Sequence, residues 1–326
     1  MRVLVTGGAG YIGSHVVRQL VERGDEVVVV DDLETGDERR IPGIPIVRTE
    51  LSDPAAIPVV REALSGVAAV IHFAGRKRVN ESVLRPAWYY QQNVGGIANL
   101  LLAMEAVGVG SLVFSSSAAV YGTSEGDSIP ESAPTNPINP YGSTKLIGER
   151  MLSDVAAVRP FRSASLRYFN VAGAGAPELG DTAVLNLVPM VFERLDAGEA
   201  PVVFGADYPT PDGTCIRDYI HVSDLAAAHL AALDAVTDGR IDGNRAFNIG
   251  TGVGSSVREM VEAIEQASGI RIEPRIVERR EGDPAVVVAD PSRARSELGW
   301  EARHTLQDIV SSAWRSHVLL ATGGHA

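Results

Sequence analysis

Residues 2–13 read RVLVTGGAGYIG, and this stretch decides the fold. The run 2–6 is short and apolar, which predicts a buried strand, while apolar residues recur at helical spacing through 11–23. Between them, residues 6–13 hold a G-x-G-x-x-G pattern that also reads as G-x-x-G-x-x-G. Such glycines let the backbone turn tightly and approach a pyrophosphate, and the helix that follows offers unpaired N–H groups to an anion. The stretch therefore predicts a strand, a phosphate-binding turn and a helix.

The next apolar strand, predicted over 27–31, ends at Asp31. An acid about 20 residues beyond the glycines is typical of dinucleotide-binding folds, where it accepts hydrogen bonds from the adenosine ribose. The charge of Asp31 would repel the extra phosphate of NADP, so we predict NAD as the cofactor. The alternatives are a glycine turn without a ligand and, for Asp31, a solvated loop carboxylate like its neighbour Asp32.

Working outward, the sequence predicts further buried strands over 68–73, 111–115 and 163–169 and helices over 88–107 and 141–157. Apolar strands separated by helical crossovers indicate a parallel sheet that is covered on both faces. The predicted fold class is therefore α/β, with a Rossmann-type doubly wound sheet.

The second half of the chain is less regular. Helices are predicted over 184–197, 256–267 and 306–320, and a strand followed by a helix over 219–235. No repeat or low-complexity linker separates this half, so we expect a smaller α/β substrate domain interleaved with the first. We expect the NAD-binding domain to comprise 1–171 with 218–250 returning to it, and the substrate domain to comprise 172–217 and 251–326.

The composition narrows the class of protein. The chain has 326 residues, of which 45% are hydrophobic and 21% charged, the balance of an ordinary globular protein. Its formal charge of −12 disfavours general attraction to nucleic acid or to an anionic membrane, so a phosphate site must be built locally. The single cysteine, Cys215, excludes an intrachain disulfide, and no apolar run approaches the roughly 20 residues that span a bilayer. We expect a cytoplasmic protein without a signal peptide.

Tyr141 and Lys145 follow Pro140 and lie one helical turn apart on the same face. A nearby ammonium favours the phenolate, so we expect it to lower the pKa of Tyr141 and to let this residue take a proton from a hydroxyl group. Ser117, in the segment FSSSAAVYG (114–122), follows a predicted strand where open α/β sheets bind ligands, and could hydrogen-bond the reacting oxygen. A lone Tyr-x-x-x-Lys pair is a common helical accident, and a serine-rich loop can simply bond its own backbone. Both segments follow a nucleotide-binding motif in the chain, and this favours a catalytic role for them.

This constellation resembles the UDP-glucose 4-epimerases of the extended short-chain dehydrogenase/reductase superfamily, from residue 1 to about residue 314. The further segments that carry the resemblance are IHFAG (71–75), LRYFN (166–170), DYPT (207–210), DGT (212–214), RDYIHV (217–222) and REGD (280–283). The resemblance implies NAD-dependent 4-epimerisation of UDP-galactose to UDP-glucose. C4 is transiently oxidised, and hydride returns to the opposite face. The implied catalytic residues are Ser117, Tyr141 and Lys145.

The resemblance also implies how NAD is held: by the glycine turn, by acids at strand ends, by the turn after 71–75 and by residues near the nicotinamide. The implied cofactor-binding residues are Gly7, Gly10, Tyr11, Ile12, Gly13, Asp31, Asp32, Glu50, Leu51, Phe73, Ala74, Gly75, Lys77, Asn93, Ser115, Tyr141, Lys145 and Tyr168. For Lys77, which lies between Arg76 and Arg78, the alternative is a solvated basic turn.

On the substrate side the implied residues are Ser117, Tyr141, Asn170, Asn186, Leu187, Arg217, Arg280, Asp283 and Val287. Two arginines suit a diphosphate because each guanidinium presents a planar fork of donors, although singly each arginine is more often a surface ion-pair residue. Where the family carries either a bulky tyrosine or a small residue, Val287 predicts a roomier sugar pocket. This room would admit UDP-N-acetylhexosamines as alternative substrates, and a UDP-uronate 4-epimerase of the same superfamily is a further alternative.

The residues also bear on other functions that the same fold supports. Dehydratases of the superfamily place an acid pair where this chain has Ser117 and Ala118, which counts against dehydration. A catalytically silent NAD sensor has no chemical need for the serine, tyrosine and lysine together. His72 and His221 lie in apolar contexts without metal-site company, so we expect core histidines and no metal. The resemblance further implies a homodimer formed through the helices at 88–107 and 141–157.

Overall fold

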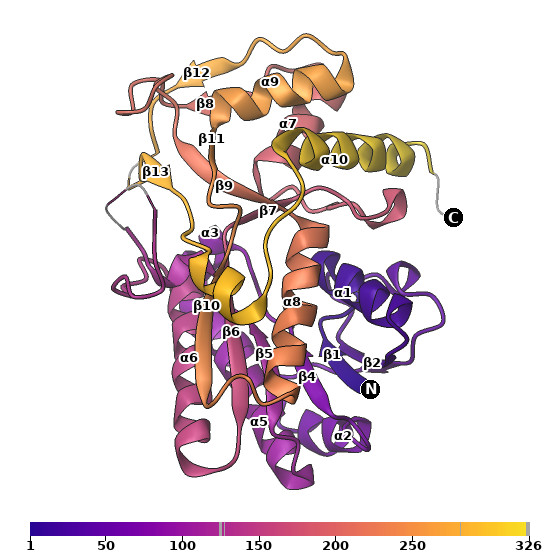
Figure 1. The fold of residues 1–326 in the computed structure, drawn as a ribbon. Helices are drawn as coiled ribbons and strands as arrows, with labels where there is room; N and C mark the ends of the chain where they lie inside the picture. The colour runs from indigo at the N-terminus through magenta and orange to yellow at the C-terminus, as the bar shows by residue number, and fades with distance from the viewer. Residues whose placement is uncertain (124–125, 127, 281, 324–326) are drawn as a thin grey trace.

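The computed structural model describes residues 1–123, 126, 128–280 and 282–323. Its centre is a seven-stranded parallel sheet in the order β10-β6-β5-β4-β1-β2-β3 (Figure 1). Because β1 pairs with β2 on one side and with β4 on the other, the strand order reverses beside β1, which opens a crevice at the carboxyl ends. The strands are β1 (Arg2–Thr6), β2 (Glu26–Asp31), β3 (Ile46–Arg48), β4 (Ala69–His72), β5 (Ser111–Ser115), β6 (Arg162–Tyr168) and β10 (Asn244–Ile249).

Helices cover both faces of this sheet. Residues of β1 alternate between two cores: Val3 and Val5 belong to one, and Leu4 belongs to the other. Burial on both faces explains why the strands are continuous apolar runs, and it confirms the predicted doubly wound α/β fold. On the Val3 face lie α1 (Tyr11–Glu22) and α8 (Val222–Thr237), which pack together, and on the Leu4 face lie α2 (Ala56–Ala63), α5 (Gly96–Val107) and α6 (Pro140–Val158).

Two features of this half were not predicted. The edge strand β3 is three residues long and at least partly exposed along its length, so no apolar run marks it. The helix predicted over 88–107 consists of α4 (Pro86–Tyr89), a π-helical turn η2 (Tyr90–Gly95) and α5, and a short helix α3 (Val79–Leu84) precedes it. Because a π-helical turn keeps the direction of the helix, its side-chain spacing resembles that of one continuous helix.

The second half of the chain builds a smaller sheet around β9 (Ile216–His221). This strand pairs in parallel with β7 (Asn170–Ala172) and β13 (Val286–Val287) and antiparallel with β11 (Gly254–Ser256). A separate two-stranded sheet joins β8 (Val202–Phe204) to β12 (Arg275–Val277). The helices α7 (Leu187–Asp196), α9 (Val257–Ser268) and α10 (Leu306–Ala321) form a second apolar core with β9.

The two sheets are joined at the carboxyl edge of the large one. Phe169 alone separates the end of β6 from the start of β7, and Figure 1 shows the small sheet beyond this end of the large sheet. At the same junction, the hydroxyl of Tyr11 donates a 2.5 Å hydrogen bond to the carbonyl of Gly173. Side chains from both halves of the chain therefore reach the crevice beside β1.

Candidate active site

The predicted catalytic pair lies at the start of α6. The helix begins with Pro140, and Asn139 caps it by accepting a hydrogen bond from the amide of Gly142 at 2.9 Å. Tyr141 and Lys145 follow one turn apart, and both are buried. The ammonium of Lys145 donates a 2.8 Å hydrogen bond to the carbonyl of Ser115 and lies 5.8 Å from the centre of the Tyr141 ring. The helix thus presents both groups at the carboxyl end of β5.

Ser117 completes this group from the other side. It follows β5 and caps a short 3₁₀ turn, where its hydroxyl oxygen accepts a hydrogen bond from the amide of Ala119 at 3.1 Å. Its side chain lies near enough to Tyr141 to lower the pKa of the phenol. The structure therefore brings Ser117, Tyr141 and Lys145 together, as the sequence predicted.

Burial sets the electrostatics of the pair. It raises the pKa of Tyr141, as does the nearby Tyr168, and Ser117 lowers it only in part. Burial lowers the pKa of Lys145 to about 8. Burial therefore opposes the lowering of the Tyr141 pKa that we expected from Lys145, and in the protein the net shift is upward.

A buried polar network, which was not predicted from the sequence, holds the loop after β5 in place. Glu149 accepts two hydrogen bonds from Arg167, at 2.9 and 2.6 Å, and one from the hydroxyl of Ser116 at 2.5 Å. Arg167 also donates to Tyr121, whose hydroxyl donates to Asn248. The available signal was Glu149 itself, a carboxylate one further turn along the α6 face that carries Tyr141 and Lys145. The network fixes Ser116, the neighbour of both Ser115 and Ser117.

The glycine turn packs so closely against the protein's own backbone that side chains would not fit there. Gly7 has a φ of 70°, and a Cβ added to it would lie 2.7 Å from the amide nitrogen of Ala74. A Cβ on Gly13 would lie 2.2 Å from the carbonyl oxygen of Gly7. α1 then begins at Tyr11 with Gly10 as its cap and no side-chain cap bond, so its first-turn N–H groups, including that of Ile12, are available to an anion. The hydroxyl of Tyr11 is bonded to Gly173, so Tyr11 contributes only its backbone to the turn.

Asp31, at the end of β2, lies beside the turn. Its two carboxylate oxygens accept hydrogen bonds from the amides of Ala9, at 3.0 Å, and Leu33, at 2.9 Å. Burial raises the pKa of Asp31, and the two amide hydrogen bonds oppose this shift. Each carboxylate oxygen keeps acceptor capacity beyond these bonds, so Asp31 can still receive a ribose hydroxyl. Its neighbour Asp32 forms an ion pair with Arg76.

The turn after β4 is held by Asn93. The side-chain oxygen of Asn93 accepts from the amide of Arg76 at 2.7 Å, and its nitrogen donates to the Arg76 carbonyl at 3.0 Å. Phe73 and Ala74 in this turn are partly buried, whereas Gly75 and Lys77 are exposed. The structure thus gives Asn93 a direct role in shaping the turn.

The remaining cofactor-side residues divide into two groups. Glu50 accepts hydrogen bonds from Ser52 and Gln92, while Leu51 lies in the apolar core. Ser115 donates a 3.0 Å hydrogen bond to the hydroxyl of Tyr168, which lies near the catalytic tyrosine. Glu50 and Leu51 lie on the β2 and β3 side of the crevice, and Ser115 and Tyr168 lie on the catalytic side.

The predicted substrate residues gather on the small sheet. Arg217 on β9 is in register with Val287 on β13 and forms an ion pair with Asp283. Asn170 pairs with Tyr219 further along β9. The guanidinium of Arg280 lies 3.9 Å from the centre of the Phe204 ring, on β8. Strand pairing therefore places Asn170, Arg217 and Val287 around one strand, a proximity that is not evident from their separation in the chain.

Asn186 and Leu187 lie at the start of α7. The side-chain nitrogen of Asn186 donates to the carbonyl of Val171 at 3.3 Å, whereas its oxygen is buried with no hydrogen-bond partner among the described residues. Leu187 is the first residue of α7, so its amide belongs to the unsatisfied first turn of the helix. A buried, unsatisfied acceptor beside free helix amides is an arrangement that a polar ligand would complete.

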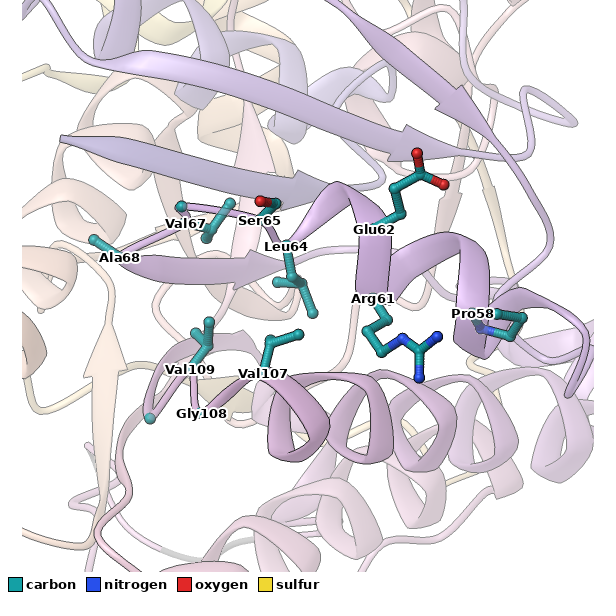
Figure 2. Close-up of a pocket in the computed structure, with 12 residues that line it drawn as sticks. Pro58, Arg61, Glu62, Leu64, Ser65, Val67, Ala68, Val107, Gly108 and Val109 are labelled. Carbon is teal, nitrogen blue, oxygen red and sulfur yellow. The ribbon is translucent and has the colours of Figure 1, made fainter.

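Two other features lie apart from this site. A hollow of about 900 Å³ lies between the ends of α2 and α5. Its lining includes Leu64, Val67 and Val109 (Figure 2). These residues precede β4 and β5, so the hollow lies at the amino ends of the strands, whereas Ser115 lies at the carboxyl end of β5. Within the described ranges, no cluster of side chains could hold a metal ion, and no helix is long and apolar enough to cross a membrane. His72 and His221 are buried and hydrogen-bonded, as predicted.

Comparison with known proteins agrees with this geometry. The model of the NAD dependent epimerase/dehydratase family matches residues 3–250. The UDP-glucose 4-epimerase of Azospirillum brasilense is 46% identical over 319 residues, which cover 96% of this chain and 90% of that protein. The structure of the UDP-glucose 4-epimerase from Stenotrophomonas maltophila, with bound NAD and formylated UDP-arabinopyranose, aligns with a TM-score of 0.92 at 43% identity over 99% of each chain. That from Bifidobacterium longum, in complex with NAD⁺ and UDP, aligns with a TM-score of 0.88 at 38% identity over 100% of each chain.

These likenesses extend over nearly the whole chain and include both the glycine turn and the catalytic helix, so the family resemblance inferred from the sequence is confirmed. The chain belongs to the NAD dependent epimerase/dehydratase family, and within it to the UDP-glucose 4-epimerases.

Proposed function

We propose that this chain interconverts UDP-galactose and UDP-glucose by 4-epimerisation and retains NAD as its cofactor. The observation that supports this most is that Tyr141, Lys145 and Ser117 lie together at the carboxyl end of β5, in a sheet whose first turn leads into a helix with available amides. The small sheet that bears Arg217 begins at the same edge. A dinucleotide and a nucleotide sugar can therefore meet at one group of acid and base residues.

The cofactor-binding residues are those that shape the crevice beside β1. The turn from Gly7 to Gly13 would receive the pyrophosphate, and Asp31 would bind the adenosine ribose, which favours NAD over NADP. Lys145 would reach the nicotinamide ribose from α6. When bound, NAD supplies the acceptor and donor of hydride at the sugar C4.

Proton transfer is the task of Tyr141. It takes the proton of the sugar 4-hydroxyl during oxidation and returns it after the 4-keto sugar has turned its other face, while Ser117 hydrogen-bonds the same oxygen. Tyr141 has to enter this step as the phenolate, and the positive charge of Lys145, whose pKa is about 8, would favour that form against the effect of burial. The reaction has no net redox change because the hydride that leaves C4 comes back to C4.

The substrate must be held by its nucleotide and not by its hexose, because the keto sugar has to rotate. Arg217 and Arg280 are proposed to bind the diphosphate, with the amide of Leu187 and the side chain of Asn186 completing the site. Asp283, now paired with Arg217, is proposed to exchange this contact for one with the nucleotide. Asn170 is proposed to contact the sugar end.

A second candidate is 4-epimerisation of a UDP-N-acetylhexosamine or a UDP-uronate. The observation that favours it is Val287, a small partly buried side chain in register with Arg217 on the neighbouring strand. A small residue leaves room for an N-acetyl group. Turnover of UDP-N-acetylglucosamine at high enzyme concentration would support this activity, and its absence would restrict the substrate to plain hexoses.

We also propose the division into an NAD-binding unit, 1–171 with 218–250, and a substrate unit, 172–217 with 251–326. The packing of α8 on α1 and the pairing of β10 with β6 support the return of 218–250 to the first unit. A homodimer through α5 and α6 is proposed as well, supported by exposed apolar side chains there, Leu102 on α5 and Val158 on α6. A monomer by light scattering would remove the dimer proposal. The cytoplasmic location stays a prediction.

The direct test is to mix the purified protein with UDP-galactose, without added NAD, and to follow UDP-glucose by chromatography. Conversion would establish both the activity and a retained cofactor. No conversion, even after NAD is added, would overturn the proposal for plain hexoses and favour a hexosamine or uronate substrate.

A further inference from the structure

Arg76 differs from the basic residues beside it. Lys77 and Arg78 are exposed, whereas the side chain of Arg76 is only 12% exposed and bonds three different residues. Its guanidinium lies 2.8 Å from a carboxylate oxygen of Asp32 and 2.7 Å from one of Glu34. Its Nε donates a 2.9 Å hydrogen bond to Gln92. A guanidinium with this many charged and polar partners is fixed in one orientation.

The path of this side chain crosses the mouth of the crevice. Arg76 follows β4, whereas Asp32 and Glu34 follow β2, and β1 lies between these two strands. Neighbouring strands are about 4.8 Å apart, so the ion pairs connect loops whose strands are about 10 Å apart. The end of β1 and the Gly7 turn lie between those loops. The bridge therefore spans the end of β1, on the adenosine side where Asp31 lies.

Both ends of the bridge are held by their own backbone contacts. Asn93 bonds the amide and the carbonyl of Arg76 and also donates to Thr144 on α6. On the other side, Asp32 accepts a hydrogen bond from the amide of Glu34 at 3.0 Å. Because both loops are fixed, the ion pair is presented at little further entropic cost, unlike an ordinary surface pair between two free side chains.

The bridge continues beyond the ion pairs. Gln92, which accepts from Arg76, donates hydrogen bonds to Glu50 and to the hydroxyl of Ser52. Polar side chains from the loops after β2, β3 and β4 are thereby joined around the adenosine side of the crevice. A ligand entering or leaving here has to pass the Arg76 side chain or displace it.

We infer that Arg76, with Asp32 and Glu34, forms a clasp over the adenosine end of bound NAD and slows its release. The inference rests on the proposed placement of NAD along the Gly7 turn. Retention has a chemical purpose in this reaction, since loss of the reduced cofactor halfway through a turnover would leave a 4-keto sugar and an enzyme unable to reduce it. Arg76 is a positioning residue for the cofactor, separate from the groups that move protons.

The test measures release of NAD and not turnover. Purified protein that holds NAD is mixed with excess isotopically labelled NAD, and exchange into the bound pool is followed by mass spectrometry. Arg76→Leu should exchange about tenfold faster than wild type, the size expected for a lost charge-assisted contact. Glu34→Ala should be faster by a smaller factor, and the double variant should add little to Arg76→Leu, because both changes open the same clasp.

Arg78→Leu is the matched control, because it removes the same charge from an exposed position in the same turn and should exchange like wild type. Equal exchange by wild type, Arg76→Leu and Glu34→Ala would overturn the clasp. If Arg76→Leu does not fold, the exposed Glu34→Ala variant decides alone, and its exchange at the wild-type rate would overturn the clasp. A wild-type protein that neither contains nor binds NAD would instead refute the proposed function.

Discussion

Lys145 lies one turn beyond Tyr141 on α6, with its ammonium 5.8 Å from the centre of the tyrosine ring and bonded to the carbonyl of Ser115. This relationship leaves the phenol of Tyr141 to meet the sugar hydroxyl and keeps the charge of Lys145 close to it. Tyr141→Phe should therefore lower the turnover number by about 10²- to 10⁴-fold, the usual contribution of a positioned proton-transfer group. The control is Tyr90→Phe, at an exposed tyrosine, which should keep full activity. Full activity of Tyr141→Phe with unchanged NAD content would refute the assignment.

The buried pair of Glu149 and Arg167 predicts a large effect on stability. Glu149→Gln leaves the Arg167 charge buried without its partner, which should lower the free energy of unfolding by about 3 to 5 kcal/mol. Glu297 and Arg245 form a matched exposed pair, and Glu297→Gln should cost less than about 1 kcal/mol. Urea unfolding of the two variants measures the difference. Similar losses in both would show that burial does not control the strength of the pair.

Four buried histidines predict loss of stability in acid. Burial lowers the pKa values of His15, His221 and His229 to about 4 and that of His72 to about 3. Because these values lie below the unfolded value near 6.5, the contribution is fully present above pH 6.5 and is lost as the pH falls from 6.5 toward 4. Each histidine should cost about 1.4 kcal/mol per pH unit in that window.

Urea unfolding of wild type and His229→Phe at several pH values between 5 and 7.5 tests this effect. The variant removes one titrating group, so its free energy of unfolding should fall less steeply with acid, by about 1.4 kcal/mol per pH unit. Parallel curves for the two proteins would mean that His229 is not held neutral by the fold.

Binding of UDP tests whether Arg217 contacts the diphosphate, as proposed. Arg217→Leu should weaken binding of UDP by about 10- to 100-fold, the range for a lost charge-assisted contact with phosphate. Calorimetric titration with UDP measures this without turnover. Arg271→Leu, at an exposed arginine paired with Glu273, controls for loss of one positive charge. Equal weakening by both variants would indicate a general effect of charge and no contact at Arg217.

The sequence predicted the features that lie within a single strand, turn or helix. The glycine turn, Asp31 at the end of β2 and the Tyr141–Lys145 pair each lie within one strand, turn or helix, so spacing alone identifies them. Burial on both faces also makes the parallel strands visible as apolar runs. These features, together with the family resemblance, were enough to predict the fold class and to propose the catalytic group.

What the sequence did not predict depends on contacts between distant segments or on burial. The Glu149–Arg167 pair and the Arg76 clasp join residues from different elements, and no spacing rule connects them. The strand β3 is too short and too exposed to leave an apolar run. The upward shift of the Tyr141 pKa was not predicted, because its main cause is burial, which is known only once the fold is known.

The central claim is that hydride leaves C4 of the sugar and returns to the same carbon. UDP-galactose carrying deuterium at C4 tests it directly, with purified protein, no added NAD and mass spectrometric analysis of the UDP-glucose formed. The account predicts that the deuterium stays at C4 of the product and does not appear in water. Loss of the deuterium to solvent, with an ordinary hydrogen at C4 of the product, would contradict it.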